Sequence, residues 1–251
     1  MISDFKNAIE QVFTDFENRL KQQELFQIQT ELLRQVQNEI EIAGYCQLES
    51  VKNISLTYKE FYNQLKESGR SYENIIAEKS LVDTYSAFEI FLSDCLYMLY
   101  KFHPKFLGKT VKVDTTYLLI TKDTSLCEKY VIEHEVKGII QSNNIMKILN
   151  IFKQEPFKLS LGISGENIFW LYEISLIRNL IVHSKSIVNS IYINSIKEIT
   201  PKYSFQENHD IFSQLNSVVA DAKTPITIVS EQIKVALIHD AQRLYTYHST
   251  K

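Results

Sequence analysis

The chain has 251 residues, of which 45% are hydrophobic and 23% are charged, and this balance excludes a wholly disordered chain. Six Gly and four Pro offer little turn chemistry for an all-β sandwich or barrel. The net charge of −3 excludes a broad basic surface, so any contact with nucleic acid must be local.

Residues 4–42 contain neither Gly nor Pro and carry two series of apolar residues at intervals of three or four. The first series is Phe5, Ile9, Val12, Phe16 and Leu20, and the second is Leu25, Ile28, Leu32, Val36 and Ile40. Both series are typical of amphipathic helices. They predict one very long helix, or two helices that break near Gln22–Gln23, ending at Ala43-Gly44.

A shorter helix is predicted over residues 55–67, with Tyr58, Phe61, Tyr62 and Leu65 on one face. Residues 1–70 therefore form a predicted N-terminal helical arm. Its apolar stripes must be buried if the arm is to be stable, either on the rest of the chain or on a second copy.

Ser71 is predicted to cap a long helix that runs to about Phe102, because Pro104 cannot continue it. Residues 104–123 are expected to be irregular, with a short strand over Tyr117 to Ile120. Further helices are predicted over residues 125–140 and 143–154.

A loop from Gln154 to Gly165 precedes a helix over Glu166 to Val182. Ile187 to Ile199 is rich in β-branched residues and is compatible with a helix or a strand. Ile226 to Val229 is predicted as a short strand, and Ser230 as the start of the last helix. The predicted fold class is mainly α: an up-and-down helical bundle over 71–251 with at most short strands, preceded by the arm.

The cysteines at 46, 95 and 127 are odd in number and widely spaced, which predicts reduced thiols in a cytoplasmic protein. The N-terminus lacks the pattern of a signal peptide. The longest apolar stretch, Phe88 to Tyr100, is interrupted by charged and polar residues, so no membrane span is predicted.

Two polar clusters have residue types that resemble those of metal or catalytic sites. Glu133-His134-Glu135 lacks the second His that a zinc-protease helix requires, since position 138 is Gly. His239-Asp240 has no partner in the sequence. Both are interpreted as surface or packing residues, and neither a metal nor a cofactor is predicted.

One segment differs, namely Glu173 to Ser186 around Arg178. The chain has 22 Lys and 5 Arg, and Arg178 is the only Arg between residues 71 and 242. A chain so biased towards Lys is expected to keep Arg where the rigid guanidinium fork is needed to hold a phosphate or carboxylate. Asn179 and His183 are four residues apart and share a helix face, whereas Arg178 lies about 140° from His183 on an ideal helix.

The alternative interpretation is a simple helix C-terminus. Arg178, His183 and Lys185 would then complement the negative end of the helix dipole, while the intervening apolar residues fill the core.

The segment Arg178-Asn179-Leu180-Ile181-Val182-His183 resembles the Arg–four residues–His motif of the HEPN superfamily, in which an Asn often follows the Arg. Upstream, Val82 to Leu92 resembles the first core helix of HEPN proteins from toxin–antitoxin and abortive-infection systems. The resemblance covers roughly residues 72–248. Related sequences often carry Asn and Gly soon after the His, where this chain has Ser184-Lys185-Ser186.

This resemblance implies a metal-independent endoribonuclease in which the RNA 2′-OH attacks the adjacent phosphate and leaves a 2′,3′-cyclic phosphate. In that scheme His183 transfers protons, Arg178 holds the scissile phosphate and Asn179 orients the phosphate or the imidazole. Lys185 would add to the RNA-binding cleft.

In-line cleavage uses one proton acceptor and one donor, whereas each chain supplies a single motif His. Two motifs facing each other across a two-fold axis would supply both, so a homodimer is expected. The resemblance further implies a toxin or antiphage effector, with an antitoxin or defence-system partner. Two other hypotheses stay open: a catalytically silent HEPN-like module that binds nucleotide, RNA or protein, and a structural helical protein that assembles through its arm.

Overall fold

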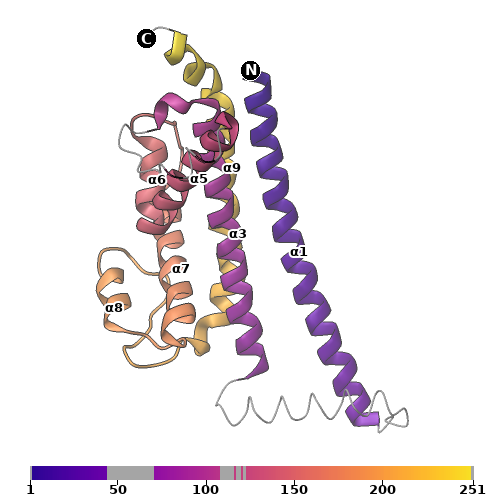
Figure 1. Cartoon of the computed structure of the whole chain (residues 1–251). Coiled ribbons are helices and arrows are strands. Elements are labelled where there is room, and N and C mark those ends of the chain that lie inside the picture. Colours follow the sequence, from indigo (N-terminus) through magenta and orange to yellow (C-terminus); the bar gives the residue numbers. More distant parts are fainter. Residues whose placement is uncertain (1, 44–70, 108–115, 117–119, 121–122, 250–251) are drawn as a thin grey trace.

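The computed structural model describes residues 2–43, 71–107, 116, 120 and 123–249 of the chain (Figure 1). Within these residues every regular element is a helix, and β pairing is limited to one isolated bridge between Ile187 and Asp210. The prediction of a mainly α helical bundle is confirmed. The predicted helix over 55–67 lies outside the described residues, and so does most of the predicted strand over Tyr117 to Ile120.

The N-terminal stretch forms one uninterrupted helix, α1 (Ile2–Ala43), so the alternative of a break near Gln22–Gln23 is wrong. Its first half packs on α3 and α9. The buried residues there are Phe5, Ile9, Val12, Phe13 and Phe16. The second half is different, because Leu25, Ile28 and Leu32 are each more than half exposed. The first apolar series is therefore part of the core, whereas the described side chains of the second series are not.

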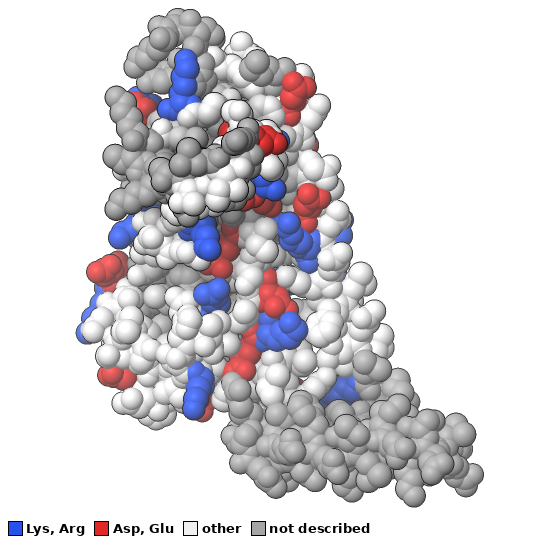
Figure 2. Space-filling view, in the orientation of Figure 1, with Lys and Arg blue, Asp and Glu red and all other residues white. Residues whose placement is uncertain are grey.

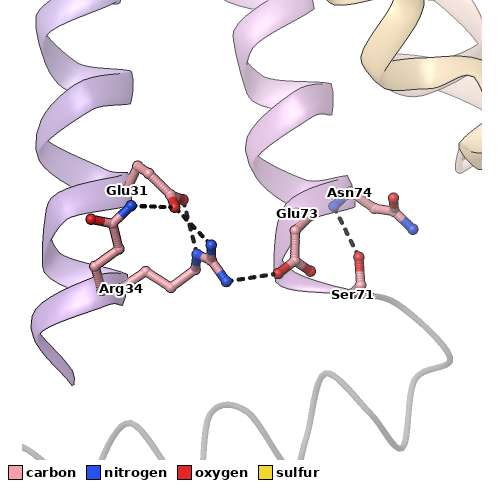
Figure 3. Close-up of polar contacts among 6 residues, drawn as sticks. Glu31, Arg34, Ser71, Glu73 and Asn74 are labelled. Carbon is pink, nitrogen blue, oxygen red and sulfur yellow. Dashed lines mark hydrogen bonds and ion pairs between the residues drawn. The ribbon is translucent and has the colours of Figure 1, made fainter. Parts of the chain in front are cut away.

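The long helix α3 (Tyr72–Phe102) lies at the centre of the bundle. Ser71 caps it as predicted, because its side-chain oxygen accepts a hydrogen bond from the backbone N–H of Asn74 (Figure 3). The helix ends before Pro104, which begins the short 3-10 helix η1 (Pro104–Phe106). Both predicted ends of this helix are confirmed.

An ion-pair cluster joins the far end of α1 to the start of α3 (Figure 3). The Arg34 guanidinium contacts Glu31 on its own helix at 2.7 Å and Glu73 on α3 at 3.5 Å. These side chains are partly exposed, so solvent screens the pairs, and they align the two helices more than they stabilise them.

The next helices are α5 (Thr124–Ser142), α6 (Ile145–Lys153) and α7 (Gly165–Ser184). Each has a polar N-cap that accepts a backbone hydrogen bond, namely Asp123, Asn144 and Ser164. All three were predicted within three residues of the observed bounds. Ile187 to Ile199, left open between helix and strand, contains the short helix α8 (Ser190–Ile196).

The last helix, α9 (Phe212–Ser249), begins 18 residues before Ser230. The predicted strand over Ile226 to Val229 is therefore wrong, as is the predicted helix start. The apolar residues continue at helical spacing on both sides of Pro225: Leu215, Val218, Ala222, Ile226, Val229, Ile233 and Leu237 are all buried. Their packing in the core outweighs the β-branched composition and the proline.

The principal helices alternate in direction along the bundle (Figure 1). α1 and α7 run one way, whereas α3 and α9 run the other. α7 therefore lies antiparallel to α3, with which it is in contact, and the middle of α3 faces the second half of α7. This arrangement positions the candidate site.

Candidate functional site at the α3–α7 contact

The Arg–four residues–His motif lies on the second half of α7. Arg178 is six residues before the end of the helix, and His183 is in the last turn. Lys185 is the C-cap residue and has a left-handed backbone with φ of 52°.

Arg178 turns towards α3 and is largely enclosed, with its side chain 23% exposed. Its Nη2 donates a hydrogen bond to Oε2 of Glu89 at 3.2 Å, and its Nη1 donates to Oδ1 of Asn179 at 3.1 Å. The guanidinium carbon lies 5.9 Å from the centre of the Tyr85 ring. The buried Nε–H has no hydrogen-bond acceptor among the described residues.

Burial governs the electrostatics around this guanidinium. It raises the pKa of Glu89, and the positive charge of Arg178 only partly opposes the shift. Burial likewise raises the pKa of the neighbouring Tyr85, reinforced by the Glu89 carboxylate. Tyr85 therefore stays neutral, and the charged form of Glu89 is poorly solvated.

The remaining predicted site residues are on the surface. Asn179, His183 and Lys185 are exposed. Asn179 is joined to Arg178 by the hydrogen bond given above. His183 and Lys185 make no side-chain hydrogen bond or ion pair with the described residues. The structure thus brings Arg178 and Asn179 together, but among the described residues no side-chain hydrogen bond or ion pair joins them to His183.

The turn after the motif is held without a glycine. Lys185 and Ser186 both have positive φ, and both backbone N–H groups donate to the carbonyl of Leu180. The Ser186 hydroxyl also donates to the buried carboxylate of Glu78 on α3. This side-chain contact fixes a left-handed turn that glycine more often supplies.

The helix-dipole interpretation accounts for part of the motif. His183 and Lys185 stand at the C-terminus of α7, where a positive charge is favourable. Arg178 lies about 9 Å further back along the axis, beyond the last turn, and is directed at Glu89 instead. The dipole therefore does not explain why Arg occupies position 178.

Two residues of this site, Tyr85 and Glu89, were not predicted as functional. Both stand in the α3 segment that carries the upstream part of the resemblance, four residues apart and thus on one helix face. That spacing was the available signal, but only the packing of α3 on α7 shows that the pair faces Arg178.

Glu89 also lines a groove between α3 and α5 with a volume of about 420 Å³. We call it the α3–α5 groove. Its walls are Ser86, Glu89, Ile90, Ser93, Asp94 and Tyr97 of α3, with Glu133, Val136, Lys137, Ile140 and Gln141 of α5. One side of the Arg178–Glu89 pair is therefore open to an accessible hollow.

The two clusters set aside from the sequence have structural partners. Glu133 pairs with Lys129 one turn earlier, at 3.7 Å. Asp240 is buried and accepts hydrogen bonds from the Ser160 backbone and from His239, which fastens the loop after α6 to α9. Over the described residues, no group of three or more potential ligands is arranged to hold a metal ion.

The surface carries mixed charge rather than a single sign. On the face drawn in Figure 2, Lys and Arg side chains alternate with Asp and Glu. None of the described helices has an apolar stretch of the length needed to span a membrane. Comparison with protein-family models, with curated proteins and with solved structures finds no match to this chain.

Proposed function

We propose that the protein is a metal-independent endoribonuclease of the HEPN type, acting in the cytoplasm as a toxin or antiphage effector. The observation that carries this proposal is the environment of Arg178. A guanidinium is enclosed between an aromatic ring and a carboxylate, and one of its N–H donors has no acceptor among the described residues. A tetrahedral phosphate oxygen would supply that acceptor.

In the proposed reaction the 2′-OH of RNA attacks the adjacent phosphorus. The P–O5′ bond breaks, leaving a 2′,3′-cyclic phosphate and a 5′-hydroxyl. Arg178 stabilises the charge that develops on the phosphate oxygens. His183, exposed at the end of α7, transfers protons as the general acid or base. Asn179 holds the guanidinium through Nη1, and Lys185 adds local positive charge.

The proton balance favours a homodimer. One imidazole must accept the proton of the 2′-OH while another group donates a proton to the departing 5′-oxygen. Val182, Ile187 and Ile191 are exposed apolar residues that lie within eight residues of His183 along the chain. We propose that they form the two-fold interface, so that two motifs share one cleft.

The test is cleavage of RNA by the purified protein in the presence of EDTA. We expect products that end in 2′,3′-cyclic phosphate, and we expect His183→Ala to abolish them. His239→Ala is the matched control, because His239 is also an exposed helical histidine but lies on α9. Cleavage that requires added divalent metal, or that survives His183→Ala, would contradict the proposal. Growth arrest on expression, relieved by a co-expressed neighbouring protein, would support the toxin and antitoxin roles.

A second candidate function is a catalytically silent module that binds nucleotide, RNA or a protein. The observation that favours it is the separation of the motif within one chain: Arg178 faces α3, and among the described residues no side-chain hydrogen bond or ion pair links it to His183. Binding of RNA that depends on Arg178 but is never followed by cleavage would support this second function.

A further inference from the structure

We propose that Glu89 is an internal competitor for the anion that Arg178 binds, and that an incoming phosphate displaces it towards Lys137 in the α3–α5 groove. This inference rests on the proposed function, because it assigns to Arg178 a phosphate ligand. It adds a resting state, in which the guanidinium is occupied by the chain's own carboxylate.

The resting pair is incomplete. A guanidinium and a carboxylate can join through two parallel hydrogen bonds, but Glu89 receives only one, from Nη2 at 3.2 Å. The adjacent Nε–H is buried and has no acceptor among the described residues. An anion that reached both nitrogens would satisfy more donors than Glu89 does, so an external phosphate can compete with the internal carboxylate.

Phosphate and Glu89 cannot share the same edge of the guanidinium at low cost. Two negative groups a few ångströms apart repel each other, and partial burial weakens the screening by water. The Glu89 side chain is 30% exposed and borders the α3–α5 groove, so a route away from Arg178 is open to it.

The groove also supplies a cation for the displaced carboxylate. Lys137 is the only basic residue among those that line the groove, and it has no ion-pair partner among the described residues. The other two acidic lining residues are already engaged, Asp94 by Arg19 and Glu133 by Lys129. Among the residues that line the groove, Lys137 is therefore the positive charge available to pair with the displaced Glu89 carboxylate.

The test is a titration with inorganic sulfate, a tetrahedral anion whose charge is constant from mildly acidic to neutral pH. Binding is followed on the Nε–H signal of Arg178 in ¹⁵N–¹H spectra, assigned from its loss in Arg178→Lys. We expect sulfate to shift this signal and Glu89→Gln to bind about fivefold more tightly than the wild type, as expected when a competing ion pair of about 1 kcal/mol is removed. Glu133→Gln is the matched control, since it removes the same charge from the same groove without touching Arg178.

Lys137→Gln should weaken sulfate binding by about two- to threefold, because the displaced carboxylate loses its second partner. Lys147→Gln, which removes an exposed lysine of α6, should have no such effect. If Lys137→Gln and Lys147→Gln bind sulfate equally, the role of Lys137 is wrong.

Equal affinities for Glu89→Gln and Glu133→Gln would overturn the competition. So would an Arg178 Nε–H signal that sulfate leaves unmoved in both the wild type and Glu89→Gln. If Glu89→Gln folds poorly, the comparison of sulfate affinity between the wild type and Lys137→Gln still tests the proposal. Because sulfate binding needs no catalysis, a protein that binds sulfate as expected but never cleaves RNA would refute the proposed function and leave this inference intact.

Discussion

Arg178 has a role that an ammonium group would fill poorly. Its nitrogens point in separate directions, to Glu89 and Asn179, while the planar group lies near the Tyr85 ring. Lysine would keep the charge but lose the fork and the flat surface.

We therefore expect Arg178→Lys to lower RNA cleavage by about 10²- to 10³-fold, the usual cost of losing a donor to a developing oxyanion. The measurement is the single-turnover cleavage rate. Arg19→Lys is the control, because Arg19 also pairs with a carboxylate of α3. Full cleavage by Arg178→Lys would show that charge alone is sufficient.

Glu173 is a buried carboxylate with a structural role, which separates it from the proposed chemistry. It is 1% exposed and accepts backbone hydrogen bonds from Lys202 at 2.7 Å and from Tyr203 at 2.9 Å. Burial nevertheless raises the pKa of Glu173, with the two hydrogen bonds opposing the shift. Its charged form is thus less favourable in the folded state than in the unfolded state.

A raised pKa in the folded state means that the folded protein retains this proton to higher pH than the unfolded chain. The contribution of Glu173 to stability is then complete below its unfolded pKa of about 4.3 and declines as the pH rises through the folded pKa. We expect Glu173→Gln to lower the free energy of unfolding by about 1–3 kcal/mol. The NH₂ group of the Gln side chain would face a backbone N–H, and two donors cannot form a hydrogen bond with each other. In urea unfolding, the difference between wild type and variant should shrink as the pH rises from 4 to 7; a constant difference would contradict the assignment.

How much of the site could be predicted differs from residue to residue. Arg178 stood out because arginine is rare in this chain, and His183 because of its spacing from Arg178. Glu89 did not, because it lies 89 residues from Arg178 in the sequence and meets it only through the antiparallel packing of α3 and α7. Local pattern identifies a chemical group, whereas its partner depends on tertiary contacts.

At the scale of the elements, α1 combines a buried half and an exposed half in one helix. The sequence shows similar apolar spacing in both halves, so its periodicity could not distinguish them. The difference lies in the kind of contact: the first half buries apolar residues against α3 and α9, whereas the second half meets them through polar pairs such as Arg34–Glu73 and Glu24–Lys223. Whether residues 1–70 form a separate arm stays a prediction, but the first half of α1 belongs to the same core as α3 and α9.

This division gives a prediction about α1. Phe16 is 1% exposed and packs its ring against Phe91, whereas Leu32 is 53% exposed. Phe16→Ala should lower the free energy of unfolding by about 3–5 kcal/mol, because it leaves a cavity in the core. Leu32→Ala should change it by no more than about 0.5 kcal/mol. Chemical denaturation of both variants checks this, and equal losses would mean that Leu32 is covered in solution.

The error in α9 has a physical origin as well. A run of β-branched residues around a proline is typical of a strand or turn, and local propensity decides such cases in isolation. Here the residues on one face of that run, Ile226 and Val229, are fully buried, so helical packing outweighs the local preference. The apolar spacing that continues from Leu215 was the better guide.

At the scale of the whole molecule, the class of fold followed from the sequence because helical periodicity recurs along most of the chain. The relation between chains does not follow in the same way, since a two-fold interface depends on which exposed side chains lie together on the folded surface. Val182, Ile187 and Ile191 are 46%, 40% and 72% exposed at the end of α7 and the start of α8. Exposed apolar residues so close to the motif are what a shared cleft requires.

If two chains share one cleft, cleavage must depend on dimerisation. The specific cleavage activity should then fall when the protein is diluted below the dissociation constant of the dimer, because a lone chain supplies one imidazole for two proton transfers. Ile191→Asp should lower the dimer fraction and the cleavage rate together while leaving the melting temperature of the folded chain nearly unchanged, since the side chain is already in water in the single chain. Leu126→Asp on α5, a matched exposed apolar position, should alter neither. Sedimentation velocity and cleavage rates over the same concentration series measure both quantities.

The prediction is contradicted if the protein is monomeric at concentrations where its specific activity is still maximal. One chain would then carry out both proton transfers. The second proton-transfer group would have to lie beside Arg178, where Glu89 is the nearest titratable candidate.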